Sequence, residues 1–233
     1  FGDDPRVELV ALSVHEGIEG YRDRSLDACE ELVDDLGLAH RTVSYADELG
    51  VEMDDVADRD PLDMNPCAYC GPFRRGLLER HAADLGADLL LTGHNLDDEA
   101  ETAMMNVFQG DVDRMGNHYD ASLGHVPQGL GARDVPESEV GLYAHLRDLP
   151  VHAVECPHAA ESFRAEVRNL LHELEERHPG TRHSVLSGYE ELAGLAADRE
   201  TDDQPALGEC AECGAPTGAE VCRSCRLVAA VSE

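Results

Sequence analysis

The spacing of the cysteines most constrains this chain of 233 residues, because seven of its eight cysteines fall into two sets with metal-ligand spacing. The set near the carboxyl end consists of two Cys-x2-Cys pairs with eight residues between them: Cys210 and Cys213, then Cys222 and Cys225. Four thiolates complete a tetrahedral zinc site, and a segment of about 30 residues is too small to fold by hydrophobic burial alone. We therefore predict a closed, structural zinc ribbon.

The second set offers only three ligands, the pair Cys67-x2-Cys70 and the distant Cys156. The pair alone fits half a zinc knuckle, a redox pair or chance. Cys156 follows a predicted strand, however, and strand ends meet at the ligand-binding edge of a parallel sheet. Three thiolates there would leave one iron of a cubane iron–sulfur cluster open to sulfide or substrate. A zinc site completed by a histidine such as His158 is the structural alternative.

The formal charge is −31, and all 18 basic residues are arginine. In dilute salt this excess would argue against binding nucleic acid, because phosphates need cationic partners. At molar salt the Debye length is about 3 Å, so we favour adaptation to a salt-rich cytosol over exclusion of polyanions. Local arginine clusters, such as Arg164 and Arg168, then matter more than the total charge.

The sequence contains no apolar run of 18 residues and no secretory signal. We therefore expect no membrane partner, and a reducing cytoplasmic location in which thiols stay available to metals.

Strand-like and helix-like segments alternate along the chain, which predicts an α/β fold with a parallel sheet flanked by helices. Strands are expected at 7–14, 40–45, 88–92 and 151–155, and helices at 26–36 (capped by Ser25 and ended by Gly37), 73–85, from 97, 137–149, 162–177 and 184–197. Irregular structure is expected up to Pro66 and a long loop at 110–136. A main domain of residues 1–200 would join a ribbon of residues 201–233 through a polar linker at 198–205.

A Gly93-His94-Asn95-Leu96-Asp97-Asp98-Glu99 stretch lies where a predicted strand turns into a helix. Helix capping by Asn95, with carboxylates on the positive end of the helix dipole, is sufficient to explain it. The same position faces the ligand crevice of a parallel sheet, where adjacent carboxylates can hold Mg²⁺ on triphosphate oxygens.

Taken in order, these motifs resemble those of the tRNA 2-thiolation enzymes, which are PP-loop ATPases of the adenine nucleotide alpha hydrolase type. The resemblance rests on Glu16-Gly17-Ile18 with Tyr21-Arg22-Asp23, Cys67-x2-Cys70-Gly71, the 93–99 stretch, Glu155-Cys156-Pro157 and the four-cysteine ribbon. It implies that ATP adenylates the C2 oxygen of a tRNA uridine and that sulfur then replaces this oxygen. It also implies a three-cysteine [4Fe-4S] cluster, a ubiquitin-like thiocarboxylate protein as sulfur donor, and a homodimer.

Carried over by position, Cys67, Cys70 and Cys156 would ligate the cluster, and Cys210, Cys213, Cys222 and Cys225 would bind Zn²⁺. Gly93, His94, Asp97 and Asp98 would bind ATP and Mg²⁺, with Asp98 as the catalytic carboxylate. Arg74 stands at a basic position of the family, where a guanidinium acts electrostatically because it does not release its proton.

Three departures qualify the resemblance. The family's Ser-Gly-Gly-x-Asp-Ser phosphate loop, first strand and N-terminal zinc finger have no counterpart. We therefore expect a truncated chain that does not bind ATP productively by itself, in preference to a defective protein. His15 stands where relatives often have Asp, and residues 126–133 replace a more basic stretch. Two alternatives follow: a PP-loop ATPase that adenylates another acceptor, and a zinc-binding tRNA- or protein-binding module without catalysis. The cysteine triad discriminates, because neither alternative needs a cluster.

Overall fold

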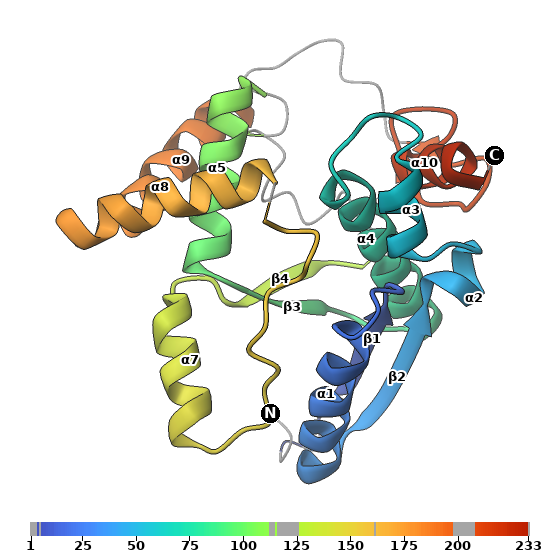
Figure 1. Ribbon diagram of the computed structural model, residues 1–233, viewed down its shortest axis with the longest axis horizontal. Helices are drawn as coiled ribbons and strands as arrows, with labels where there is room; N and C mark the ends of the chain where they lie inside the picture. Colours follow the sequence, from blue (N-terminus) through green and yellow to red (C-terminus); the bar gives the residue numbers. More distant parts are fainter. Residues whose placement is uncertain are drawn as a thin grey trace. The chain divides into compact units, whose positions relative to one another are not determined.

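The computed structural model describes residue 4 and residues 6–111, 115, 126–160, 162–197 and 208–232. Strands and helices alternate along the amino-terminal part (Figure 1), in the order β1 (Val10–His15), α1 (Arg22–Leu36), β2 (Ala39–Ser44), α2 (Tyr45–Leu49), α3 (Met53–Arg59), α4 (Cys67–Asp84), β3 (Leu90–Asn95) and α5 (Leu96–Gln109). They are followed by β4 (Gln128–Ala132), α7 (Glu137–Leu146), α8 (Phe163–Arg177), α9 (Thr181–Ala197), β5 (Gly208–Glu209), β6 (Pro216–Thr217) and α10 (Arg223–Ser232).

The strands β1 to β4 pair in parallel, as predicted for an α/β fold. β1 lies beside β2 in register from Val10 opposite Ala39 to His15 opposite Ser44. β3 lies beside β4, and β5 and β6 form a short antiparallel hairpin. None of the helices in the described residues is both long and apolar enough to cross a membrane.

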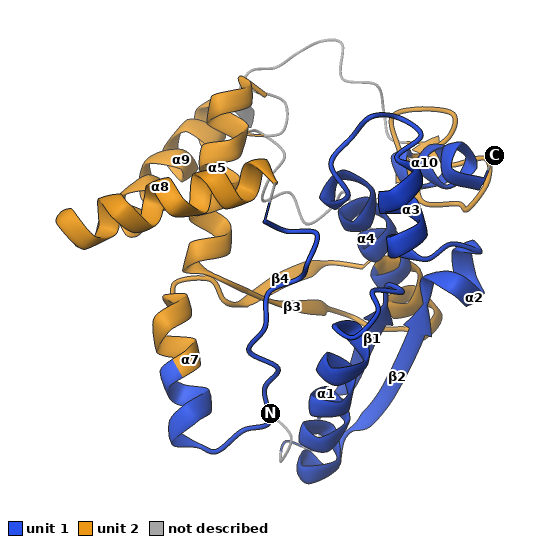
Figure 2. Cartoon of the chain, in the orientation of Figure 1, with its two compact units in different colours: residues 1–78, 142–160, 223–233 blue, residues 79–141, 161–222 orange. Residues whose placement is uncertain are grey.

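The chain forms two compact units that interleave in sequence (Figure 2). Unit 1 comprises residues 1–78, 142–160 and 223–233, and unit 2 comprises residues 79–141 and 161–222. The core of unit 1 is built from β1, β2 and α2 to α4 together with α10, and its largest fully buried side chains include Tyr45, Tyr69 and Phe73. In unit 2, Ala100 of α5 packs with Val167 and Leu171 of α8. The division at residue 200 stays a prediction, and the expected linker at 198–205 lies outside the described residues.

Two of the predicted helix caps are confirmed and one is wrong. Gly37 ends α1 with φ of 64°, and Asn95 opens α5 with a full capping box. α1, however, begins at Arg22 with Tyr21 as its N-cap residue, so Ser25 lies inside the helix. The apolar stripe starts a turn after the helix does, which explains why the pattern placed the start too late.

Three irregular or extended segments also differ from prediction. The stretch before Pro66 contains α2 and α3, which are too short to show a helical period. The expected loop at 110–136 contains β4, in which two of the five residues are glycines, so the segment lacks the residue types typical of a strand. Gly129 is needed there because a Cβ at this position would lie 2.8 Å from the Leu91 side chain of β3. The segment 151–155 is not a strand, because Val151 and Val154 are 64% and 58% exposed and lack a partner sheet among the described residues.

Candidate active site

Cys67 and Cys70 lie on the first turn of α4, in unit 1. The side-chain oxygen of Asn65 accepts the backbone N–H of Cys67 at 2.9 Å, and the carbonyl of Pro66 accepts that of Cys70 at 3.0 Å. Residues three apart on a helix share one face, so both thiols point the same way. Cys67 is exposed and Cys70 is half-buried.

The structure brings Cys156 to the same part of unit 1. Cys156 and Cys70 both pack against the unit 1 core, and Cys67 Sγ lies 3.9 Å from the carbonyl oxygen of His158. The Cys156-Pro157-His158 segment therefore lies against the start of α4, as the predicted triad requires.

The three cysteines of the triad are not gathered as tightly as the ligands of a single zinc ion. Four thiolates bound to one zinc ion at 2.3 Å have sulfurs about 3.8 Å apart. Across the described parts of the chain, only the tail cysteines gather three or more candidate ligands within 4.8 Å. A cubane binds each thiolate at a different iron, so its cysteines lie farther apart. The exposed Cys67 beside the half-buried Cys70 is compatible with cysteines that each bind a different iron.

His158 is engaged away from the cysteines. Its Nε2 lies 2.7 Å from Asp54 Oδ1, and Asp54 Oδ2 accepts the backbone N–H of Glu19 at 2.8 Å. Asp54 thereby ties the Cys156 segment to the Glu16-Gly17-Ile18 loop. Because Nε2 is bound to a carboxylate, His158 does not offer this nitrogen as a fourth zinc ligand.

A buried carboxylate organises the basic residues beside Cys70. Glu16 is 1% exposed, and its Oε1 accepts from Arg74 Nε at 2.8 Å and from Arg22 Nη2 at 3.0 Å. Arg74 Nη2 also lies 3.4 Å from Cys70 Sγ. Burial raises the pKa of the Cys70 thiol, and the Arg74 guanidinium opposes this rise.

A pocket of about 230 Å³ adjoins this group, lined by Glu16, Arg22 and Arg74 and by apolar side chains of β1, α1 and α4. The two guanidinium groups outnumber the single carboxylate, so the wall of this pocket carries a net positive charge. Such a wall suits an anionic ligand.

His15, where relatives often carry Asp, has a local structural role. Its Nδ1 accepts the backbone N–H of Gly17 at 3.1 Å, and its Nε2 lies 2.9 Å from Asp23 Oδ1. This arrangement links the end of β1 to the first turn of α1.

The predicted nucleotide residues lie in unit 2, at the β3–α5 junction. The pairing of β3 with β4 shifts register between Thr92 and Asn95, and the intervening Gly93 and His94 are exposed. Asp98 Oδ2 accepts the backbone N–H of Asn95 at 3.1 Å, while Asn95 Oδ1 accepts that of Asp98 at 3.0 Å. Asp98 therefore caps the helix with one oxygen, and within the described residues its Oδ1 makes no hydrogen bond.

Asp97 is committed to structural contacts. Its Oδ1 lies 2.8 Å from Arg182 Nε, and its Oδ2 accepts the backbone N–H of Glu137 at 2.8 Å. Nearby, Glu101 is buried and binds the two arginines of α8, Arg164 at 3.0 Å and Arg168 at 2.9 Å. The expected arginine cluster is thus neutralised in part by one carboxylate.

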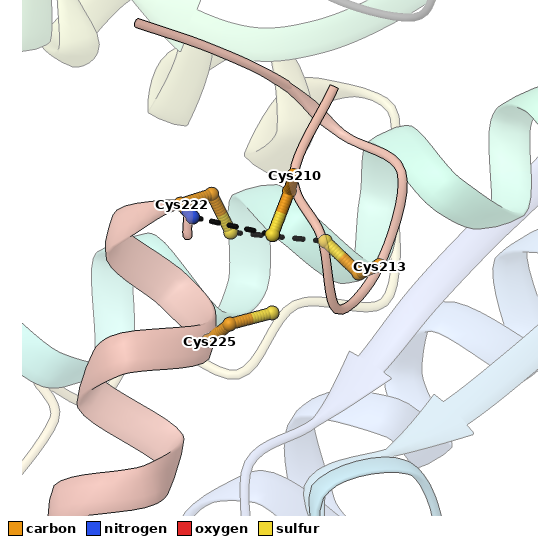
Figure 3. Close-up of side chains that lie close together, drawn as sticks. All are labelled: Cys210, Cys213, Cys222 and Cys225. Carbon is orange, nitrogen blue, oxygen red and sulfur yellow. Dashed lines mark hydrogen bonds between the residues drawn. The ribbon is translucent and has the colours of Figure 1, made fainter. Parts of the chain in front are cut away.

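The four tail cysteines gather as their spacing predicts, as Figure 3 shows, with their candidate ligand atoms within 4.8 Å of one another. Sulfurs of Cys213 and Cys222 lie 3.7 Å apart, and Cys210 Sγ accepts the backbone N–H of Cys222 at 3.2 Å. This hydrogen bond, together with weaker ones from Cys213 and Glu212, outweighs burial and lowers the pKa of the Cys210 thiol to about 6. A favoured thiolate and four close sulfurs fit a tetrahedral metal ion.

Sequence reasoning missed three residues that shape this site: Glu16 as a buried anchor, Tyr45 and Asp54. Tyr45 is fully buried, and its hydroxyl donates to the carbonyl of Cys70 at 2.7 Å. Glu16 belongs to the Glu16-Gly17-Ile18 motif of the family resemblance, and this signal could have identified it as a site residue. Tyr45 and Asp54 carried no signal, because their partners are distant in sequence.

Comparison with known proteins agrees with these features, although no protein-family model matches the chain. The chain is 56% identical over 242 residues to the tRNA 2-thiolation protein NcsA of Haloferax volcanii, a halophile, covering 99% of this chain and 75% of that protein. It is 37% identical over 227 residues to the cytoplasmic tRNA 2-thiolation protein 1 of Aspergillus niger, covering 95% of this chain and 65% of that protein.

A solved structure, the U34-tRNA thiolase NcsA from Methanococcus maripaludis with its [4Fe-4S] cluster, superimposes with a TM-score of 0.81 at 35% identity. The match covers 97% of this chain and 71% of that one, and it confirms the fold class. On these grounds the chain belongs to the family of tRNA 2-thiolation proteins.

Proposed function

We propose that the chain is an ATP-dependent tRNA uridine 2-sulfurtransferase that acts in the cytoplasm. The observation that carries the proposal is the approach of the Cys156 segment to the Cys67–Cys70 turn within unit 1, where Cys67 Sγ lies 3.9 Å from the carbonyl of His158. The description of the Methanococcus relative as a U34-tRNA thiolase with a [4Fe-4S] cluster supports both the reaction and the wobble uridine as substrate.

Cys67, Cys70 and Cys156 would hold a [4Fe-4S] cluster, which, when bound, supplies an iron without a cysteine ligand for the incoming sulfide. The chain's own residues prepare this position. Arg74 and Tyr45 fix Cys70 by contacts to its sulfur at 3.4 and 3.6 Å, while Cys67 remains exposed. The tail cysteines would hold Zn²⁺ in a structural role.

The uridine C2 oxygen attacks the α-phosphorus of ATP, the bond to the β-phosphate oxygen breaks, and pyrophosphate leaves. Sulfide then attacks C2, the activated C–O bond breaks, and AMP departs with the oxygen. Gly93, His94 and Asp98 are our proposed ATP residues, with Asp98 holding Mg²⁺ through the oxygen that its capping bond leaves available. Asp97 fixes the helix through Arg182 and Glu137, and Arg74 stabilises anionic groups.

The proposed partners follow from the same chemistry. tRNA is the acceptor, a ubiquitin-like protein with a C-terminal thiocarboxylate supplies the sulfur, and the protein works as a homodimer. The net-positive wall formed by Glu16, Arg22 and Arg74 supports an anionic substrate in unit 1.

Replacing Cys156 by serine tests this proposal. Wild-type and variant proteins that include the family's phosphate loop are reconstituted anaerobically, and iron, labile sulfide and zinc are measured beside the formation of 2-thiouridine in tRNA. We expect about four irons and four sulfides per wild-type chain, and loss of thiolation in Cys156→Ser with the tail metal retained.

Retained zinc is the internal control that the variant is folded. Full sulfur transfer by Cys156→Ser would contradict the cluster assignment. A wild-type chain that adenylates an acceptor but takes up no labile sulfide would favour a PP-loop ATPase with another acceptor.

A further inference from the structure

Glu16 is the most deeply buried charged side chain among the described residues of unit 1, at 1% exposure. A carboxylate at this depth is costly unless cationic donors satisfy it. Arg22 supplies one donor through Nη2 at 3.0 Å and contacts the second oxygen through Nε, and Arg74 supplies another through Nε at 2.8 Å. Glu16 therefore fixes two guanidinium groups in one place.

The guanidinium of Arg74 contacts a second group besides Glu16. Its Nη2 lies 2.7 Å from Glu16 Oε1 and 3.4 Å from Cys70 Sγ. Cys70 and Arg74 are four residues apart on α4, a spacing that brings side chains together on a helix. The planar guanidinium presents its N–H groups at fixed angles, so anchoring Nε and Nη2 on Glu16 directs the second N–H of Nη2 toward the sulfur.

Arg74 needs such an anchor because its side chain is 44% exposed. An arginine with that access to solvent samples many rotamers unless a partner holds it. Glu16 lies on the loop after β1, 58 residues before Arg74, so the anchor comes from a different element of unit 1.

We propose that Glu16 is a positioning residue of the sulfur-transfer site: it holds Arg74 against Cys70 Sγ, so that this sulfur carries a charge-assisted hydrogen bond when Cys70 ligates the cluster. Hydrogen bonds to ligand sulfurs tune the electronic properties of iron–sulfur clusters. The inference rests on the proposed function, because it concerns the same cysteine.

The test is resonance Raman spectroscopy of the reconstituted protein, which reports the stretching of the iron–cysteine bonds. We compare wild type, Glu16→Gln, Arg74→Met and the double variant, with iron and labile sulfide measured in each. Arg75→Met, a change at the exposed neighbour on α4, is the matched control.

We expect Glu16→Gln and Arg74→Met to keep the cluster and to shift the same iron–sulfur band, and the double variant to shift it no further than Arg74→Met alone. Arg75→Met should leave the band in place. An unshifted band in Glu16→Gln, or a further shift when Glu16 is changed in the Arg74→Met background, would overturn the proposal.

Should Glu16→Gln fail to fold, Glu16→Asp carries the test, because its shorter side chain draws Arg74 away from Sγ and must shift the same band. A wild-type chain that takes up no iron and labile sulfide overturns the cluster and this inference together. A cluster whose band does not respond to Glu16 overturns the inference alone.

Discussion

Substituting alanine for Gly17 tests how tightly the loop that carries Glu16 is packed. Gly17 has φ of +70°, and a Cβ at this position would lie 2.6 Å from Glu52 Cβ and 3.0 Å from Glu52 Cα. Gly20, three residues later, has the same φ of +70° but nothing within 4 Å of its Cβ position. Gly20→Ala is therefore a matched control that separates backbone strain from steric overlap.

Both variants force a side chain into the left-handed region, which costs about 1–2 kcal/mol. Only Gly17→Ala adds an overlap with atoms at and next to the backbone of Glu52, which rotamer changes cannot relieve. Overpacking of this kind costs about 1–3 kcal/mol. The loop cannot easily retreat, because the carbonyls of Glu16 and Gly17 accept the backbone N–H groups of Met53 at 2.9 Å and Asp54 at 3.2 Å.

We therefore expect Gly17→Ala to lower the free energy of unfolding by about 2–5 kcal/mol, and Gly20→Ala by about 1–2 kcal/mol. Urea unfolding at fixed high salt, followed by far-ultraviolet circular dichroism, measures both values. Equal losses in the two variants would refute the steric reasoning and show that Glu52 yields without cost.

Three further predictions concern other parts of the chain. Asn95→Ala removes the capping box of α5 and should lower the free energy of unfolding by about 1 kcal/mol in the same assay; no change would mean that the capping bonds contribute nothing. Burial raises the pKa of the Glu99 carboxyl above its usual 4.5, against the lowering by Arg133. Because the pKa of Glu99 is higher in the folded than in the unfolded chain, ionising this carboxyl at pH 7 lowers the free energy of unfolding. Glu99→Gln should therefore be more stable than wild type at pH 7 and should lose this advantage near pH 4. An equal difference in stability at both pH values would contradict this prediction. Leu227→Ala should lower the free energy of unfolding by about 2–5 kcal/mol in the same urea assay, because Leu227 is 6% exposed in the core of unit 1. A loss below about 0.5 kcal/mol, as for a surface residue, would place α10 outside that core.

Features that depend on short spacings were predictable from the sequence. The tail cysteines share one short stretch, so their convergence follows from spacing, and Asn95 caps α5 through a residue three positions away. β4 was not predictable, because Gly129 and Gly131 carry no strand signal and matter only through the close approach of β3. The apolar run at 151–155 led to a wrong prediction for the opposite reason: it has the composition of a buried strand, but its valines are exposed to solvent.

The candidate site divides in the same way. Cys67 and Cys70 are recognisable from their spacing, whereas the approach of Cys156 is a result of long-range packing. The prediction for Cys156 rests on a strand at 151–155 that the structure does not form, and on the family resemblance. The contacts of Glu16 with Arg74 and of Asp54 with His158 join residues 58 and 104 positions apart. Local sequence propensities do not predict contacts between such distant residues. The sequence also does not distinguish a buried glutamate or aspartate from an exposed one.

The tail helix α10 packs in the same core of unit 1 as the helix that carries Cys67 and Cys70. Leu227 and Val231 of α10 lie in the same core cluster as Phe73 and Leu77 of α4, the helix that carries Cys67 and Cys70. A Cβ on Gly76 would lie 3.2 Å from Ser224 Oγ, so glycine lets the two helices approach closely, and Arg59 donates to the carbonyl of Val231 at 2.7 Å. Cys225, one of the four proposed metal ligands of the tail, lies on α10 itself. α10, and with it Cys225, therefore belongs to the packed scaffold that supports Cys67 and Cys70 in unit 1.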